Sequence, residues 1–185
     1  MEKIILASQS PRRKELLHLA AIDFEVIVSE TDESFPEGLT FDEAAIFIAK
    51  QKALAVANTN INRIILAADT IVICNNTIFG KPKDREDAIQ MLTAISGNTH
   101  QVITAVCLLH KAEEHCFADI TTVTFHKLTQ EQITFYVDTN KPYDKAGAYA
   151  IQEWIGAVGI KKIEGDFYNV MGLPISRVVA LLASL

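Results

Sequence analysis

Apolar positions along the chain follow two spacings, strand-like runs and helix-like stripes, separated by turn residues. Six apolar runs predict strands: residues 3–7, 23–28, 64–74, 101–110, 116–126 and 160–163. The third run is the most apolar, and the fourth and fifth predict an antiparallel hairpin joined around residues 112–114. Because helical segments separate the early strands and a hairpin follows them, the pattern indicates a mixed α/β fold.

Helix starts are indicated by residues that cap a first turn. Capping boxes begin at Thr40, with Glu43, and at Thr129, with Gln132, and Ser10 precedes a proline at the first helical position of another segment. Five helices are expected on this basis: residues 11–20, 40–57, 84–95, 129–137 and 174 to near the C-terminus. The segment 138–159 is predicted to be rich in loops.

The length of 185 residues suits one domain, residues 1–185, or two small lobes around a shared core. From the order of the elements we expect a mixed, curved β-sheet flanked by helices. The two lobes are expected to lie around a central cleft, where ligand sites usually form.

Charge and composition narrow the classes of function. The formal net charge is −6, which argues against a general nucleic-acid or anionic-membrane surface, because both partners favour a basic protein face. No apolar stretch approaches the roughly 20 residues of a membrane span, and the N-terminus lacks the pattern of a cleaved leader. We therefore expect a soluble, cytoplasmic protein in which any phosphate site is local.

The three cysteines, Cys74, Cys107 and Cys116, fall in strand-like apolar runs and show no C-x-x-C spacing. This pattern favours buried thiols in a reducing compartment over disulfides or a zinc site. The five histidines show no H-E-x-x-H or other ligand spacing, which also argues against a zinc hydrolase.

Three charges lie where apolar residues are expected. Asp69 is in the middle of the most apolar strand, and Arg13 and Lys52 lie on the apolar stripes of the first two predicted helices. An unpaired buried carboxylate would cost several kcal/mol, so something must compensate Asp69. Taken singly, each charge is equally compatible with a structural ion pair or a side chain extended along apolar surface. Together they suggest one polar cleft.

Two loops resemble anion sites. Ser8–Gln9–Ser10–Pro11–Arg12–Arg13 follows the first strand and opens a helix, which directs backbone N–H groups and two guanidinium groups at the loop. Gly80–Lys81–Pro82 holds a cation between a flexible and a rigid residue after the Asp69 strand. The alternatives are a simple helix cap and an ordinary turn. The chain has no Walker A pattern.

Six segments are informative when taken together: SQSPRRKELL at 8–17, ADTIV at 68–72, GKP at 80–82, SGNTH at 96–100, KAGAYAIQ at 145–152 and GDFYNVMGLP at 165–174. In this order they resemble the Maf family of nucleoside triphosphate pyrophosphatases. The resemblance covers nearly the whole chain. It implies a fold of the Maf and inosine triphosphate pyrophosphatase type, and hydrolysis of a nucleoside triphosphate to the monophosphate and pyrophosphate.

The resemblance also assigns roles to residues. The catalytic residues that it implies are Asp69, Lys52, Lys81 and Glu33. The substrate-binding residues that it implies are Ser8, Arg12, Arg13, Thr70 and Gln152. Arg12, Thr70 and Gln152 mark the branch that acts on dTTP and UTP. A divalent cation, Mg²⁺ or Mn²⁺, would be held by Glu33, Asp69 and phosphate oxygens, since hard cations take oxygen ligands. A homodimer is compatible with this assignment.

Two alternatives are open at this point. One is a pyrophosphatase that prefers unusual purine triphosphates, which would need a pocket for a purine. The other is a nucleotide-binding regulator of septum formation that need not turn over its ligand. Trp154 directly after Glu153, and a less aromatic run at 158–160, depart from the family pattern, so the wall of the base pocket is expected to differ.

Overall fold

The computed structural model describes residues 2–111 and 113–185. Its elements in chain order are β1 (Ile4–Leu6), α1 (Pro11–Leu19), β2 (Phe24–Val26), α2 (Phe41–Ala57), β3 (Ile65–Cys74), β4 (Thr77–Phe79), α3 (Arg85–Ile95), β5 (Thr99–His110), β6 (Glu113–Phe125), α4 (Gln130–Asn140), the 3₁₀ turn η1 (Ala146–Ala148), α5 (Trp154–Gly159), β7 (Ile160–Glu164), α6 (Phe167–Met171) and α7 (Ile175–Ala183). The predicted hairpin joint includes Ala112, which lies outside the described residues.

The described strands form one mixed sheet of seven, in the order β2-β1-β3-β5-β6-β7, with β4 paired to β3. β1 runs parallel to β2 and β3, whereas β4 runs antiparallel to β3 and β7 antiparallel to β6. The predicted mixed α/β fold with a helix-flanked sheet is thereby confirmed.

The chain divides into two compact units. The first unit contains the residues up to Thr70 together with Thr104–Asp119 and Gly172–Leu185, and the second contains Ile71–Ile103 and Ile120–Met171. The assignment of the whole chain to one domain stays a prediction.

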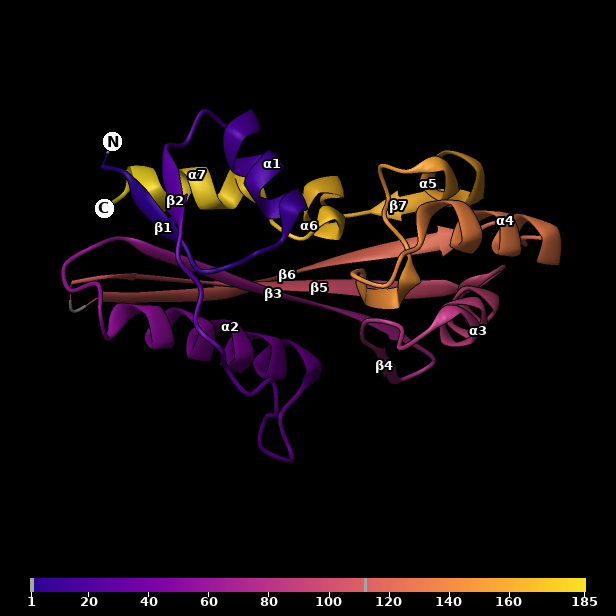
Figure 1. Cartoon of the computed structure of the whole chain (residues 1–185), viewed down its shortest axis with the longest axis horizontal. Helices are drawn as coiled ribbons and strands as arrows, with labels where there is room; N and C mark the ends of the chain where they lie inside the picture. Colours follow the sequence, from indigo (N-terminus) through magenta and orange to yellow (C-terminus); the bar gives the residue numbers. More distant parts are fainter. Residues whose placement is uncertain (1, 112) are drawn as a thin grey trace. The chain divides into compact units, whose positions relative to one another are not determined.

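In the first unit, helices cover both faces of the strands. Figure 1 shows α2 on one face and α1 and α7 on the other. Strands covered on both sides are expected to be apolar throughout, and residues 4–6 and 65–69 are indeed buried without interruption. α2 presents small residues such as Ala45, Ala49 and Ala53 to the core, which allows its backbone to approach the sheet closely.

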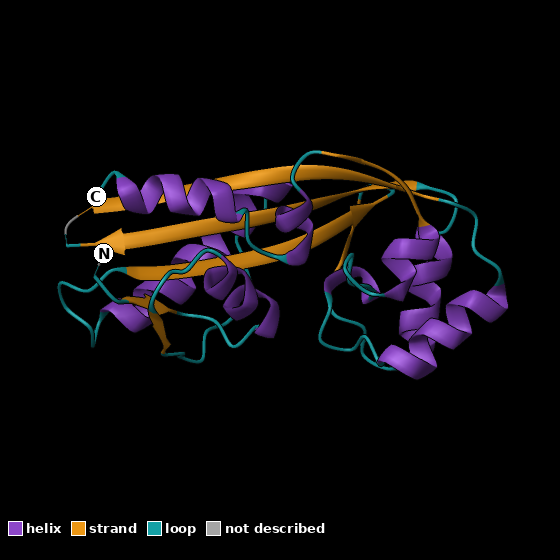
Figure 2. Cartoon of the chain, turned by 90° about the horizontal axis from the view of Figure 1, so that it is seen from above, coloured by secondary structure: helices purple, strands orange, loops and turns teal. Residues whose placement is uncertain are grey.

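In the second unit, α3 packs against α4 and η1, and Figure 2 shows α3, α4 and α5 grouped at the right. Its core includes an aromatic cluster in which Tyr149 makes edge contacts with His100 and Phe125, with ring centroids 5.4 Å and 5.2 Å apart. His100 Nε2 and the Tyr149 hydroxyl are 2.7 Å apart, so the polar tips of two buried rings satisfy each other.

Several helix starts that were predicted from capping residues are confirmed. Both predicted capping boxes form, at Thr40 with Glu43 and at Thr129 with Gln132. The Asp84 side chain accepts a hydrogen bond from the backbone N–H of Asp87, 2.9 Å away, at the start of α3. No helix in the described ranges has the length and apolar character needed to cross a membrane.

Four short elements were not predicted. β4 follows an Asn75–Asn76 turn in which both residues have positive φ, a tight hairpin turn that the sequence prediction missed. α6 was also missed. The loop prediction for 138–159 is wrong in part, because η1 and α5 lie within it. Glycine disfavours a helix, so Gly156 argued against α5 in the sequence. In the structure a glycine is required at this position, because any side chain would collide with the Ile151 carbonyl.

The prediction of buried thiols is wrong for two of the three cysteines. Cys107 on β5 and Cys116 on β6 form a disulfide across nine residues of sequence, with their Cα atoms 4.2 Å apart. Neighbouring strands of a hairpin bring these two cysteines opposite each other, although they are nine positions apart in the sequence. The C-x-x-C pattern concerns only cysteines three positions apart, so its absence does not exclude such a pair. Cys74 is free and buried as predicted, and burial raises the pKa of its thiol.

Candidate active site

Asp69 occupies the middle of β3 and is compensated by a lysine from α2. The Lys52 Nζ atom lies 2.7 Å from Asp69 Oδ1, and both side chains are largely buried. Lys52 belongs to the apolar stripe of α2, so its aliphatic part packs toward the sheet while its ammonium reaches the carboxylate. The structure thus confirms the expectation that the buried carboxylate needs a partner.

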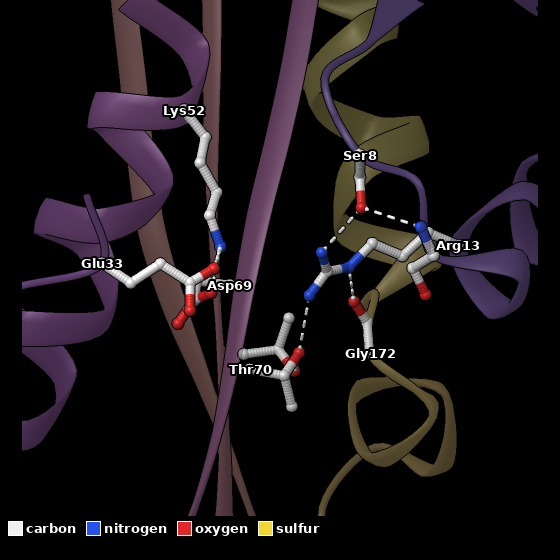
Figure 3. Close-up of polar contacts among 9 residues, drawn as sticks. Ser8, Arg13, Glu33, Lys52, Asp69, Thr70 and Gly172 are labelled. Carbon is white, nitrogen blue, oxygen red and sulfur yellow. Dashed lines mark hydrogen bonds and ion pairs between the residues drawn. The ribbon is translucent and has the colours of Figure 1, made fainter. Parts of the chain in front are cut away.

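A second carboxylate joins this pair from the loop after β2. Glu33 Oε1 lies 2.8 Å from the same Lys52 Nζ, although the Glu33 side chain is 60% exposed. The neighbouring Asp32 accepts hydrogen bonds from the backbone N–H and the hydroxyl of Ser34, at 2.9 Å and 2.7 Å, which stabilises the turn that carries Glu33. The result is one ammonium between two carboxylates, shown in Figure 3.

Arg13 forms a different network, at the start of α1. Its Nε donates to the Gly172 carbonyl at 2.8 Å, Nη1 to the Ser8 hydroxyl at 2.9 Å and Nη2 to the Thr70 hydroxyl at 3.0 Å. A guanidinium has five N–H donors, so at most two of them are left for a ligand. Arg13 therefore ties the loop after β1 to β3 and to the turn between α6 and α7.

Thr104 and Gly172 complete this network. The hydroxyls of Thr70 and Thr104 lie 3.0 Å apart, so Thr104 orients the group that accepts from Arg13. Gly172 has φ +113°, a conformation that side chains rarely adopt, and its carbonyl is aimed at Arg13. Both residues were missed in the sequence. Thr104 could have been noticed in the sequence, because it is a polar residue within the otherwise apolar run 102–108, which is buried in the structure.

The three misplaced charges thus take part in two hydrogen-bonding networks. Asp69 and Thr70 are consecutive residues of β3, so their side chains point to opposite faces of the strand. Figure 3 shows β3 passing between Lys52 and Glu33 on one side and Ser8 and Arg13 on the other. That the three charges line one polar cleft stays a prediction. Burial lowers the pKa of the Arg13 guanidinium, and the nearby charge of Asp69 opposes this effect.

The loop from Ser8 to Arg13 leaves β1 beside the Asp69 strand. Leu6 pairs with Leu66, and the Ala7 N–H donates to the Leu66 carbonyl at 2.8 Å, so the loop begins at the level of Ala67–Asp69. Ser10 and Pro11 start α1 as predicted, but the Ser10 side chain makes no capping hydrogen bond. The positive end of α1 is therefore not neutralised by its cap and retains the character of an anion site.

The second unit carries two of the predicted site residues, Lys81 and Gln152. Both side chains are exposed. Lys81 follows Gly80, whose carbonyl accepts a hydrogen bond from the Gly147 N–H at 3.1 Å, so the loop of Lys81 is attached to η1. Gln152 lies in a turn just before α5. A buried lysine nearby, Lys145, was not predicted as a functional residue, although it stands in the segment KAGAYAIQ.

The carboxylates around Lys52 suit a divalent cation. Asp69 Oδ1 and Glu33 Oε1 lie 2.7 Å and 2.8 Å from the same ammonium, so the two carboxylates are close to each other. Mg²⁺ is typically held by one or two carboxylates together with substrate phosphates rather than by a complete cage of protein ligands. The donor set therefore fits such a cation in the presence of a phosphate ligand.

The chain is similar to known proteins over nearly its whole length. The family model described as Maf-like protein matches residues 3–185. A protein from Cytophaga hutchinsonii is 48% identical over 95% of this chain and 81% of its own length, and one from Bacillus cytotoxicus is 49% identical over 97% and 93%. A protein from Phocaeicola vulgatus is 47% identical over 99% and 96%. All three relatives are named dTTP/UTP pyrophosphatase.

Solved structures with a similar fold are more distant in sequence. The HAM1 protein from Coxiella burnetii superposes with a TM-score of 0.55 at 16% identity over the whole of both chains. The Ham1 protein of Staphylococcus aureus gives a TM-score of 0.54 at 19% identity over 99% of each chain. These matches support the fold alone, whereas the family match spans nearly every residue. The chain belongs to the Maf family.

Proposed function

We propose that this protein is a nucleoside triphosphate pyrophosphatase that hydrolyses dTTP and UTP to the monophosphate and pyrophosphate. The observation that carries the proposal is the group formed by Asp69, Lys52 and Glu33, found in a chain 46–49% identical to relatives named for this activity. A buried carboxylate with a fixed cation beside it is a common arrangement for activating water next to a phosphate.

Asp69 is proposed to orient and deprotonate the attacking water. Lys52 holds Oδ1 at 2.7 Å and so fixes the direction of the carboxylate. The water oxygen bonds to the α-phosphorus, the bond from that phosphorus to the bridging oxygen breaks, and pyrophosphate leaves with the electron pair. The water proton passes to Asp69.

Phosphate binding is proposed for Ser8, Arg12, Arg13, Lys52 and Lys81. The start of α1 contributes a helix dipole as well as the two arginines, and together these neutralise charge that develops on the leaving pyrophosphate. Arg13 can add at most two N–H groups, because three already bond to Ser8, Thr70 and Gly172. Its larger part in this proposal is to hold Ser8 in place.

Glu33 and Asp69 are proposed to hold Mg²⁺ or Mn²⁺ together with phosphate oxygens. Such a cation would withdraw negative charge from the phosphate oxygens during the reaction. The same proposal includes a cytoplasmic location and a homodimer.

Base recognition is proposed for Gln152, with indirect help from Arg12 and Thr70. The exposed amide of Gln152 offers a donor and an acceptor, as the O4–N3–H edge of thymine or uracil requires. The Thr70 hydroxyl is already engaged by Arg13 and Thr104, which favours a positioning role for it over direct contact with the base.

The deciding experiment measures product release from a panel of nucleotides with Mg²⁺, Mn²⁺ or EDTA. We expect dTTP and UTP to give pyrophosphate and monophosphate first, with no free orthophosphate, and EDTA to stop the reaction. Asp69→Asn should bind nucleotide without turnover. Orthophosphate as the first product, or a clear preference for 7-methyl-GTP or a purine triphosphate, would reject the proposal.

A further inference from the structure

The second unit contains a buried lysine that the proposed reaction does not use. Lys145 is 8% exposed, and its Nζ lies 2.8 Å from Asp144 Oδ1 and 3.5 Å from Glu153 Oε1. An ammonium in such a place is retained only when carboxylates compensate it. The Glu153 side chain is itself only 24% exposed, so one of the two compensating groups is also drawn into the interior.

A fully buried tyrosine holds the other oxygen of the same carboxylate. The hydroxyl of Tyr136, on α4, donates to Glu153 Oε2 and accepts a hydrogen bond from the Ala150 backbone N–H at 3.1 Å. Lys145 and Tyr136 therefore fix Glu153 from two sides. The same hydroxyl also fixes the backbone at Ala150, three residues before Glu153.

Ala150 and Glu153, the two residues attached to Tyr136, lie on either side of Gln152 in the sequence. The Glu153 N–H donates to the Ala150 carbonyl at 3.1 Å, which closes residues 150–153 into a turn. Within the turn, Ile151 is 4% exposed and anchors the segment in the core, whereas the Gln152 side chain is exposed. Both ends of the turn meet at the Tyr136 hydroxyl, which thus holds the backbone that carries Gln152.

We propose that Tyr136, Glu153 and Lys145 form a positioning network that sets the orientation of Gln152 and thereby the selectivity of the enzyme for a pyrimidine base. The network rests on the proposed function of Gln152 but assigns residues that need not touch the substrate. A pre-oriented amide discriminates between bases, because a wrong base then leaves polar groups unpaired instead of meeting a side chain that can rotate to suit it.

Tyr136→Phe tests the network by removing one oxygen atom. We expect kcat/KM for dTTP to fall about fivefold or more, the scale of one buried hydrogen bond, through a higher KM. The values for CTP and GTP should change little. Tyr149→Phe is the matched control, since it removes a buried hydroxyl of the same unit that bonds to His100 and not to the Gln152 turn. It should leave the dTTP preference unchanged.

The dependence on Gln152 is tested by a double-mutant cycle. In a Gln152→Leu background, Tyr136→Phe should cause no further loss of dTTP preference, because the group that it positions is gone. If Tyr136→Phe does not fold, Glu153→Gln replaces it: this variant keeps the shape, weakens the attachment to Lys145, and should lower the same preference in the same cycle.

The outcomes separate the two proposals. If the unchanged protein releases pyrophosphate from no pyrimidine nucleotide, the proposed function is wrong. If it prefers dTTP but the variant loses activity equally on dTTP, CTP and GTP, or if the effects of Tyr136→Phe and Gln152→Leu simply add, the positioning network is wrong and the proposed function stands. Urea unfolding of each variant measures its free energy of unfolding and so distinguishes a folded variant with lower activity from one that has lost the fold.

Discussion

Replacement of Lys52 tests the pairing at the centre of the site. Lys52→Met keeps the aliphatic part that packs along α2 and removes the ammonium that lies 2.7 Å from Asp69. The carboxylate is 13% exposed, so little water can take the place of the lost cation. Removing one partner of a buried pair costs about 3–5 kcal/mol, and the residual exposure here brings the expected loss to about 2–4 kcal/mol. Glu33, 60% exposed, adds little because water can solvate it.

The same helix offers a matched control. Lys50 forms an ion pair with Glu114 at 2.8 Å, a distance similar to that of the Lys52 pair, but the two side chains are 39% and 41% exposed. Exposed pairs contribute about 0–1 kcal/mol, so Lys50→Met should change the free energy of unfolding by no more than that. The two variants thus differ in burial and not in chemistry.

The assay is urea unfolding at pH 7, followed by circular dichroism, together with dTTP turnover. Adding Asp69→Asn to Lys52→Met removes the uncompensated charge, and the double variant should return to within about 1 kcal/mol of the original stability. Turnover of dTTP should be at least about 10²-fold lower in both Lys52→Met and the double variant. Each lacks the Lys52 ammonium, which would stabilise the negative charge that develops during the reaction. Equal stability of Lys52→Met and Lys50→Met would refute the reasoning.

Three further expectations follow from the same structure. Lys81→Ala should lower dTTP turnover about 10²-fold without changing the urea midpoint, and near-normal turnover would return Lys81 to an ordinary turn residue. Burial lowers the pKa of His100 to about 4 from an ordinary value of 6.5. The unfolded chain therefore takes up that proton first as the pH falls, so about 3 kcal/mol of stability, complete above pH 6.5, should be lost between pH 6.5 and 4. A His100→Gln protein with an equally steep loss of unfolding free energy over this range would contradict that assignment. Arg13→Lys should lower the free energy of unfolding by about 2–4 kcal/mol, because one ammonium cannot reach Ser8, Thr70 and Gly172 together. Arg63→Lys, at a pair whose side chains are 34% and 38% exposed, is the control for urea unfolding and should cost under about 1 kcal/mol, so equal losses would show that the three Arg13 bonds are not needed.

Features that depend on neighbouring residues could be predicted from the sequence. The capping boxes at Thr40 and Thr129 form as expected, since a cap involves groups only three residues apart. The burial of Asp69 was also predictable, because its apolar neighbours in the strand leave it no route to water. The sequence indicated that a compensating charge must exist, and Lys52 on the inner stripe of α2 was among the candidates.

Features that depend on distant residues could not be predicted in this way. Arg13 and Gly172 are separated by 159 positions, and no local pattern connects a carbonyl in a turn to a guanidinium that far away. The disulfide between Cys107 and Cys116 required the exact register of a hairpin. Lys145 was overlooked for a related reason: its segment reads as a loop, and a lysine in a loop is expected to be solvated rather than 8% exposed.

The alternation of side chains along β3 links these networks in the first unit. Asp69 faces Lys52 and Glu33, and the next residue, Thr70, faces Arg13 and Thr104. A slip of the strand by one residue would exchange the two faces, bring the hydroxyl to the lysine and place the carboxylate against the Arg13 fork. Because apolar residues are buried on both faces of β3, such a slip would keep most of its apolar side chains buried, and hydrophobic burial does little to choose between the two registers. The polar contacts do choose: the slip would break the pair of Asp69 with Lys52 and the hydrogen bond between Thr70 and Arg13 together, so the two misplaced polar residues themselves help to fix the register of the strand.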